Sequence, residues 1–249
     1  MDFEGKVLFA TGGGSGIAAA TARRFASGGG RVAIVDLDAA RANEVAGDID
    51  GAIGLGGDVA DEDSVVAAIE TARDQLGGID CVLNAAGHAA FGPIEEWTLE
   101  GWHRMMAVHA GGTFLVCKHV LPIMRAQGGG SIVNIASTAA LTANKNNSPY
   151  GAAKGAIVAF SRQLAREAAP EIRVNTVAPG RVRTGMTEPL FADRGATADE
   201  GAKRFGMANL QERVAEPDEL AAPICFLLSD EASFITGTLL VVDGGETAI

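Results

Sequence analysis

The chain has 249 residues with 31 acidic and 20 basic side chains, which gives a formal net charge of -11 at pH 7. Hydrophobic residues make up 47% of it, which excludes a disordered acidic protein, and the acidic surplus argues against a nucleic-acid partner, because phosphate backbones need a basic surface. No apolar run approaches the ~20 residues of a membrane-spanning helix, and Asp2 and Glu4 stand where a signal peptide carries positive charge, so we expect a cytoplasmic protein without a membrane partner.

Short apolar runs alternate with helical stretches along the chain. The expected strands are 6–10, 31–36, 52–59, 79–83, 131–137, 173–177 and 239–242. The expected helices are 17–26, 62–76, 99–124, 148–168 and 217–228. Gly111 and Gly112 indicate a break or a close helix contact within 99–124. This alternation predicts a Rossmann-type, doubly wound α/β fold, in which about seven parallel strands are covered by helices on both faces. No linker divides residues 1–249, so we expect a single domain.

The three cysteines, Cys81, Cys117 and Cys225, are far apart in the sequence and form no Cys-x-x-Cys pair. Disulfide and zinc frameworks need closer or paired spacing. We therefore expect reduced thiols in the core and no metal site.

A glycine-rich turn, residues 11–17, stands between the first strand and the first helix. The backbone N–H groups of such a turn can approach a phosphate at the helix N-terminus, although Ile17 occupies the place of the third glycine in the usual G-x-G-x-x-G pattern. Asp36 ends the next strand, where a carboxylate can bind ribose hydroxyls and would repel a 2′-phosphate. The sequence therefore predicts a dinucleotide site that favours NAD over NADP.

Tyr150, the only tyrosine, stands four residues before Lys154 on an expected helix. Residues with this spacing share a helix face, and a nearby ammonium lowers the pKa of a phenol, which general acid–base catalysis near neutral pH requires. Ser137 ends an expected strand 13 residues before Tyr150, and the carboxyl ends of parallel strands are where ligands bind. The three residues together indicate a catalytic site.

With these motifs the chain resembles a short-chain dehydrogenase/reductase of the single-domain type over nearly its whole length. Residues 11–18 match the family's T-G-x-x-x-G-x-G except at Ala18, and residues 84–87 resemble its N-N-A-G except at Ala85. Further matches are the Ser137, Tyr150 and Lys154 set, Asp58-Val59, Pro179-Gly180 with Val182 and Thr184, and the C-terminal stretch 241–245. Any one of these motifs is weak, whereas their order and spacing together are specific.

The resemblance implies an NAD-dependent oxidoreductase that interconverts a secondary alcohol and a ketone. Ser137 would hydrogen-bond the substrate oxygen, Tyr150 would give or take the hydroxyl proton, and Lys154 would hold the nicotinamide ribose. The expected cofactor-binding residues are Gly12, Gly14, Ser15, Gly16, Ile17, Asp36, Leu37, Asp58, Val59, Asn84, Ala85, Gly87, Tyr150, Lys154, Pro179, Gly180, Val182 and Thr184.

His109 marks a departure from the family pattern. Members of the family usually carry an asparagine here, which anchors a water in a proton relay to solvent. An imidazole can also hold a water and titrates near ~6.5. Two interpretations stay open: His109 takes over the relay as a catalytic residue, or it fills space and the relay is weakened or rerouted.

Substrate contacts are expected from His88, Ser137, Thr138 and Asn147. Residues 144–147 are typical of a polar surface loop, with a substrate contact as the alternative. Phe91, Trp97 and Trp102 are expected mainly as packing residues, with a substrate-binding role as the alternative. Residues 183–210 fit the alternation poorly and resemble the family's variable substrate lid. The resemblance also implies a homotetramer or homodimer. Two rival functions remain: a 3-oxoacyl thioester reductase on the same scaffold, and a dinucleotide-sensing or scaffold protein that has lost catalysis.

Overall fold

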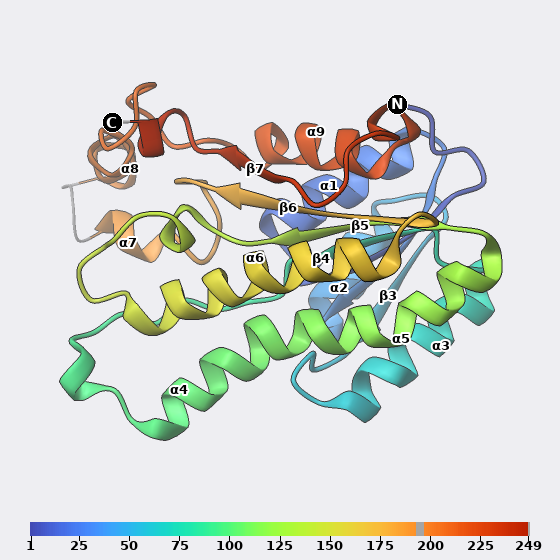
Figure 1. The fold of residues 1–249 in the computed structure, drawn as a ribbon. Coiled ribbons are helices and arrows are strands. Elements are labelled where there is room, and N and C mark those ends of the chain that lie inside the picture. The colour runs from blue at the N-terminus through green and yellow to red at the C-terminus, as the bar shows by residue number, and fades with distance from the viewer. Residues whose placement is uncertain (193–196, 249) are drawn as a thin grey trace.

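Seven parallel strands form one sheet in the part of the chain that the structure, a computed structural model, describes: residues 1–192 and 197–248. The strands are β1 (Val7–Thr11), β2 (Arg31–Asp36), β3 (Ala52–Gly56), β4 (Cys81–Asn84), β5 (Gly130–Ile135), β6 (Ile172–Pro179) and β7 (Leu239–Val242). Their order in the sheet is β3-β2-β1-β4-β5-β6-β7 (Figure 1). The strand order reverses beside β1, so the predicted doubly wound sheet is confirmed.

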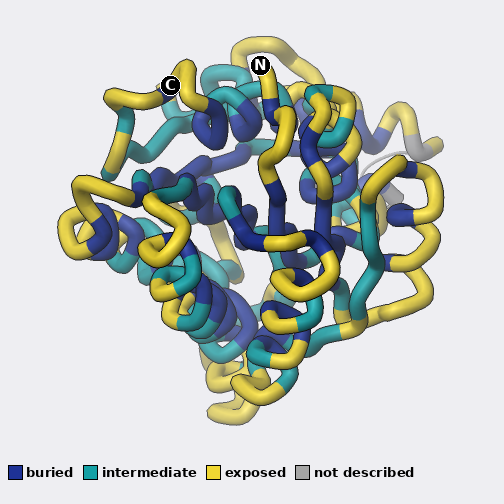
Figure 2. The backbone as a smooth tube through the Cα atoms, turned by 90° about the vertical axis from the view of Figure 1, so that its right-hand side faces the viewer, coloured by how far each residue is buried: buried dark blue, intermediate teal, exposed yellow. Residues whose placement is uncertain are grey.

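Helices cover both faces of the sheet because strand side chains point alternately to either side. On one face, α1 (Gly16–Ser27), α2 (Ala39–Gly47) and α9 (Pro217–Leu228) pack in a cluster with Leu8 and Ala10 of β1. On the other, α3 (Glu62–Leu76), α5 (Gly112–Gln127) and α6 (Ser148–Ala168) pack in a cluster with Val7 and Phe9. Figure 2 shows the resulting buried interior beneath exposed loops.

Helix α2 was not predicted from the sequence. It has nine residues and buries only Ala42, Val45 and Ala46, which leaves little apolar periodicity to detect. The available signal was Asp38, whose side chain accepts hydrogen bonds from the N–H groups of Ala40 and Arg41 and so caps the helix start.

The helix expected over 99–124 consists of α4 (Leu99–Met106), a π-helical segment (Ala107–Gly111) and α5. The π segment lies where the sequence suggested a break or a close contact at Gly111 and Gly112. A Cβ atom on Gly112 would lie 2.8 Å from the side chain of Val59, so the glycine allows α5 to approach the β3–α3 loop.

The stretch Leu99–Gln127 is long and apolar enough to cross a membrane by length and composition, so the expectation that no such segment exists was wrong. That expectation counted consecutive apolar residues, whereas this helix reaches a mean hydropathy of 1.2 over its best window with polar residues interspersed. Its residues Val116, Cys117 and Val120 belong to the sheet core, and the core helix of a soluble protein passes the same test.

The three cysteines are free and buried, as predicted for core thiols. Burial raises the pKa of Cys117 and that of Cys225 to about 12, and it raises the pKa of Cys81 as well. These thiols are therefore protonated at neutral pH.

The segment expected as a lid, 183–210, forms two short helices above the sheet edge: α7 (Pro189–Ala192) and α8 (Ala198–Gly206) (Figure 1). Residues 193–196 of the expected lid lie outside the described residues. Phe191, Ala202 and Val214 form a small apolar cluster separate from the sheet cores. Single 3₁₀ turns complete the fold: η1 (Ile94–Glu96), η3 (Thr138–Ala140), η4 (Asp230–Ala232) and η5 (Glu246–Ala248).

Candidate active site

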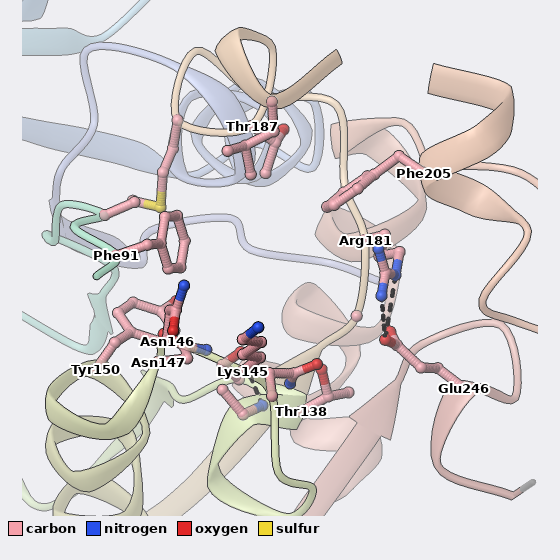
Figure 3. A pocket seen from close by; sticks show the side chains of 17 residues that line it. Phe91, Thr138, Lys145, Asn146, Asn147, Tyr150, Arg181, Thr187, Phe205 and Glu246 are labelled. Atoms are coloured by element: carbon pink, nitrogen blue, oxygen red, sulfur yellow. Dashed lines mark hydrogen bonds and ion pairs between the residues drawn. The ribbon is translucent and has the colours of Figure 1, made fainter. Parts of the chain in front are cut away.

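A cavity of about 690 Å³ opens at the carboxyl ends of β5 and β6 (Figure 3). Because all strands are parallel, the loops that follow them meet at this edge. Predicted residues among its lining are Ser137, Thr138, Asn147, Tyr150 and Gly180. Met186, Thr187, Leu190 and Phe205, which belong to the expected lid segment 183–210, also line it. Lining residues that were not predicted are Ala89, Ala139, Arg181 and Glu246. Phe91 and residues 144–147 also line the cavity, so Phe91 is more than a packing residue and the polar loop faces the site.

Ser137 and Tyr150 meet across this cavity. Ser137 precedes η3, and its Oγ accepts a hydrogen bond of 3.2 Å from the N–H of Ala139. Tyr150 lies in the first turn of α6, where a proline at the start fixes the helical entry. The Ser137 side chain is close enough to the Tyr150 phenol to influence its pKa, so the two predicted proton-handling groups lie together at the cavity wall.

Burial raises the pKa of Tyr150 above its ordinary value, and the nearby Ser137 side chain opposes that effect only in part. The Tyr-x-x-x-Lys spacing predicts that Lys154 lowers this pKa. Instead, the Nζ atom of Lys154 donates to the carbonyl oxygen of Ile135 at 2.9 Å and lies 5.7 Å from the centroid of the Tyr150 ring. The lysine is itself buried, and burial lowers the pKa of Lys154 to about 7, so it is only partly charged at neutral pH.

His109 lies in the π-helical segment and is 1% exposed. Its Nε2 atom lies 2.9 Å from the carbonyl oxygen of His88, and its ring meets the Tyr150 ring edge-on at 5.4 Å. Burial, with a smaller contribution from Lys154, lowers the pKa of His109 to about 3. A Cβ atom on Gly87 would lie 2.5 Å from the imidazole, so the glycine makes room for this ring.

The glycine turn after β1 has the backbone that a phosphate site needs. Gly12 has a φ of +67°, and a Cβ atom there would lie 2.8 Å from the Cα atom of Ala86. Thr11 braces the neighbouring turn, since its Oγ1 accepts hydrogen bonds from the N–H groups of Ala85 and Ala86. Ser15 precedes α1 without capping it through its side chain, so the first N–H groups of α1 have no side-chain acceptor from this residue.

Asp36 ends β2 beside this turn. Its Oδ2 atom accepts a hydrogen bond from the N–H of Gly14 at 3.0 Å, and its Oδ1 atom accepts one from the N–H of Asp38 at the same distance. The carboxylate therefore fixes the turn and stays partly exposed. A side chain on Gly14 would displace it, because a Cβ atom there would lie 2.9 Å from Oδ2.

A second cavity, of about 260 Å³, extends from the glycine turn towards α4. Predicted residues that line it are Gly12, Asp36, Leu37, Asp58, Val59, Gly87 and His88. His88, which was expected to contact the substrate, thus lies on the side of the glycine turn and is absent from the lining of the first cavity. Arg104 also lines the second cavity, and its Nη1 atom lies 3.3 Å from Oδ2 of Asp58. Arg104 was not predicted from the sequence, because no local pattern connects α4 with the loop after β3.

Several predicted cofactor residues line neither cavity. Asn84 is buried, and its amide donates to Oδ1 of Asn134 at 2.9 Å, so it braces β4 against β5. Val182 is buried in the core, whereas the methyl group of Thr184 would lie 3.1 Å from a Cβ atom on Gly16. Thr184 therefore borders the glycine turn. The others in this group are Gly14, Ser15, Gly16 and Ile17 of the glycine turn, Ala85, Pro179 and the buried Lys154.

These features suit a bound dinucleotide. The N-terminus of α1 offers backbone N–H groups that the Ser15 side chain does not cap, and Asp36 offers hydroxyl acceptors beside a cavity that Asp58 borders. The expected clash of a Cβ atom at Gly12 shows how closely this backbone is packed.

Comparison with known proteins agrees with this geometry. A family model described as enoyl-(acyl carrier protein) reductase matches residues 12–247. D-threitol dehydrogenase of Mycolicibacterium smegmatis is 41% identical over 98% of this chain and 94% of its own length. Cis-4-hydroxycyclohexanecarboxylate dehydrogenase of Sinomonas cyclohexanicum is 40% identical over 99% and 98%. The crystal structure of 3-ketoacyl-(acyl-carrier-protein) reductase from Brucella melitensis complexed with NADH is 35% identical, with a TM-score of 0.91 and coverage of 99% and 100%.

Proposed function

The chain belongs to the short-chain dehydrogenase/reductase family and is an oxidoreductase that acts on CH–OH groups, and from this premise we propose that Ser137, Tyr150 and Lys154 carry its chemistry. The observation that carries the proposal is that Ser137 and Tyr150 both line the larger cavity, with the Nζ atom of Lys154 5.7 Å from the centroid of the tyrosine ring. The reaction is the interconversion of a secondary alcohol and a ketone. When bound, the dinucleotide takes or gives the hydride.

The protein residues handle the proton and the orientation of the substrate. The Ser137 hydroxyl donates a hydrogen bond to the substrate oxygen and so fixes the reacting carbon. The Tyr150 phenol gives a proton to that oxygen during reduction and takes it during oxidation. Lys154, whose Nζ atom lies beneath the tyrosine ring, holds the ribose and compensates the phenolate when it forms.

We propose that His109 assists proton transfer by holding a water beside Tyr150 and not by gaining or losing a proton itself. Its Nε2 atom is engaged with the backbone of His88, and the low pKa of His109 keeps the ring neutral across the working pH range. A neutral ring can still hold a water on its other nitrogen, so the proton path to solvent passes beside His109 without charging it.

We propose NAD(H) as the physiological cofactor. The Asp36 carboxylate is held beside the glycine turn by two backbone N–H groups, where it would accept hydrogen bonds from ribose hydroxyls and repel a 2′-phosphate. We also propose a single-domain cytoplasmic protein that forms a homotetramer or homodimer. The exposed Phe114 on α5, edge-on to Phe160 on α6, gives these helices an apolar outer surface.

The test is NADH formation from NAD by the purified protein, with a panel of secondary alcohols, diols and sugars. Tyr150→Phe removes the proton-transfer group, and we expect turnover to fall by about 10²–10⁴-fold while NADH binding is retained. Ser137→Ala should also lower turnover, whereas Ser27→Ala, at an exposed helix end, should not. Turnover by Tyr150→Phe at the wild-type rate would contradict the assigned role.

A 3-oxoacyl thioester reductase is the second candidate, since the matched family model and one structural relative carry acyl-carrier-protein reductase names. Asp36 weighs against it, because reductive biosynthesis more often uses NADPH. Faster NADPH-dependent reduction of acetoacetyl thioesters than of any free ketone would favour it. NADH binding without turnover of any alcohol, ketone or thioester would instead favour a sensing or scaffold role.

A further inference from the structure

An ion pair closes the end of the larger cavity away from the catalytic tyrosine. Arg181 follows β6 and Glu246 stands in η5, so the two come from distant parts of the chain. The Nε and Nη2 atoms of Arg181 both reach Oε1 of Glu246, at 3.1 and 3.0 Å. The guanidinium also lies 4.3 Å above the ring of Phe205 on α8, which holds it in place.

This pairing leaves Oε2 of Glu246 free. The atom is shielded from solvent and has no hydrogen-bond partner among the described residues. The two side chains are only 20% and 13% exposed, and a buried acceptor without a donor costs free energy unless a ligand supplies one. A small rotation of the Glu246 side chain would present Oε2 to a donor in the cavity that Glu246 lines.

The charges at this end of the cavity select for a neutral partner. Arg181 and Glu246 neutralise each other, so an anionic group would gain from the guanidinium and lose to the carboxylate beside it. A hydroxyl group can accept a hydrogen bond from the guanidinium and donate one to Oε2 at the same time. The pair is therefore matched to hydroxyls and mismatched to carboxylates and phosphates.

A second free acceptor lies near the catalytic tyrosine. Oδ1 of Asn147 is likewise shielded and without a partner among the residues described, and Asn147 lines the same cavity. Figure 3 shows Asn147 close to Tyr150 and the Arg181–Glu246 pair at the other end, with Thr138 between them. The polar groups thus run along the cavity from the reacting end to the far end.

Part of the wall is apolar and includes Phe91, Met186 and Leu190. A ligand with hydroxyls on one side and C–H groups on the other would satisfy both walls, as polyols and sugars do. Lys145 is the remaining cation of the lining, and it belongs to an exposed loop where solvent hydrates its charge. It therefore does not demand an anionic ligand.

We propose that the substrate is an uncharged polyol or sugar whose hydroxyl groups remote from the reacting carbon are bound by Arg181 and Glu246, with Asn147 binding one nearer to it. This inference rests on the proposed alcohol oxidation and adds the substrate class. Removal of a remote hydroxyl from the substrate should lower kcat/KM, because the buried polar groups that would bind this hydroxyl are then left without partners. Removal of the Glu246 carboxylate should lower kcat/KM as well, because the hydroxyl then loses its acceptor.

The experiment compares four-carbon substrates by NADH formation: a tetritol, 2,3-butanediol, 2-butanol and 3-hydroxybutyrate. We expect the wild type to turn over the tetritol with a kcat/KM at least about tenfold above those of 2-butanol and 3-hydroxybutyrate. Glu246→Ala should lower the tetritol value by about tenfold or more, leave 2-butanol within about twofold, and raise 3-hydroxybutyrate, because Arg181 becomes an unpaired cation. Glu70→Ala, at an exposed position of α3, is the matched control and should change none of the four.

Three outcomes would overturn parts of this account separately. A wild-type preference for 2-butanol or 3-hydroxybutyrate over the tetritol would overturn the polyol assignment while leaving alcohol oxidation intact. An equal loss on all four substrates in Glu246→Ala would overturn the role of the ion pair. NADH binding without oxidation of any alcohol or reduction of any ketone would overturn the proposed function. If Glu246→Ala fails to bind NADH, the wild-type series and the milder Glu246→Gln decide the substrate class.

Discussion

The Nε2 atom of His109 lies 2.9 Å from the carbonyl oxygen of His88 and 3.2 Å from its backbone nitrogen. Depending on the tautomer, Nε2 either donates to the carbonyl oxygen of His88 or accepts from the N–H of His88, so it satisfies only one of the two backbone groups at a time. The other ring nitrogen, Nδ1, is buried and has no hydrogen-bond partner within the described part of the chain. An asparagine amide carries a donor and an acceptor together and could serve both backbone groups.

This geometry predicts the pH–rate profiles of His109 variants. His109→Asn should keep the wild-type profile between pH 5 and 9, since the pKa of His109, at about 3, lies below that range. His109→Ala should lower kcat/KM about tenfold without shifting the profile, because the His88 backbone loses its partner. An apparent pKa near 6.5 that is present in the wild type and lost in both variants would show that the imidazole titrates during turnover.

The lowered pKa of His109 also predicts that the folded protein loses stability in acid. The unfolded chain binds a proton at His109 near pH ~6.5, whereas the folded protein does so only near the lowered pKa of about 3. Between these values the unfolded state holds more protons, so the unfolding free energy falls with decreasing pH by up to about 1.4 kcal/mol per pH unit.

Urea unfolding measured from pH 7 to pH 4 tests this stability effect. His109→Asn should lose stability less steeply than the wild type, because asparagine does not titrate. The exposed His103 on α4 supplies the control, since His103→Asn should keep the wild-type slope. Parallel slopes for all three proteins would contradict the assigned burial effect.

Asp36 predicts the cofactor preference. Titration of protein fluorescence should show tighter binding of NADH than of NADPH, because the carboxylate repels the 2′-phosphate. Asp36→Asn removes the negative charge and should lower the ratio of the NADPH and NADH dissociation constants about tenfold, mainly through stronger NADPH binding. Asp38→Asn, which changes a neighbouring charge that caps α2, is the control for general electrostatics. Tighter binding of NADPH by the wild type would reverse our interpretation of Asp36.

Local patterns predicted the sheet, and they also placed Ser137, Tyr150 and Asp36 at the edge where the cavities lie. Each of these residues ends a strand or follows one by a fixed spacing, so the signal lies within one strand–helix unit. Arg181 and Glu246 are 65 positions apart and meet only because β6, the lid and the C-terminal turn converge. The orientation of Lys154 towards Ile135 was equally hidden, because it depends on burial and not on the Tyr-x-x-x-Lys spacing.

Arg173 near the start of β6 predicts a stability effect remote from the site. Its Nη1 atom donates to the carbonyl oxygen of Leu227 at 2.8 Å, and its Nη2 atom donates to that of Ser229 at 2.9 Å, at the end of α9. Longer contacts reach the carbonyls of Leu228 and Ile235. The planar guanidinium thus satisfies carbonyl groups that the helix end leaves without partners.

A lysine at position 173 could reach only part of this carbonyl set with its single ammonium group. We expect Arg173→Lys to lower the unfolding free energy by about 2 kcal/mol, measured by denaturant unfolding at neutral pH. Arg166→Lys, the same change at an exposed position of α6, should shift it by less than about 0.5 kcal/mol. Because α9 packs against α1, which begins at the glycine turn, Arg173→Lys should also weaken NADH binding. Equal unfolding free energies for Arg173→Lys and Arg166→Lys would show that the carbonyl contacts contribute nothing.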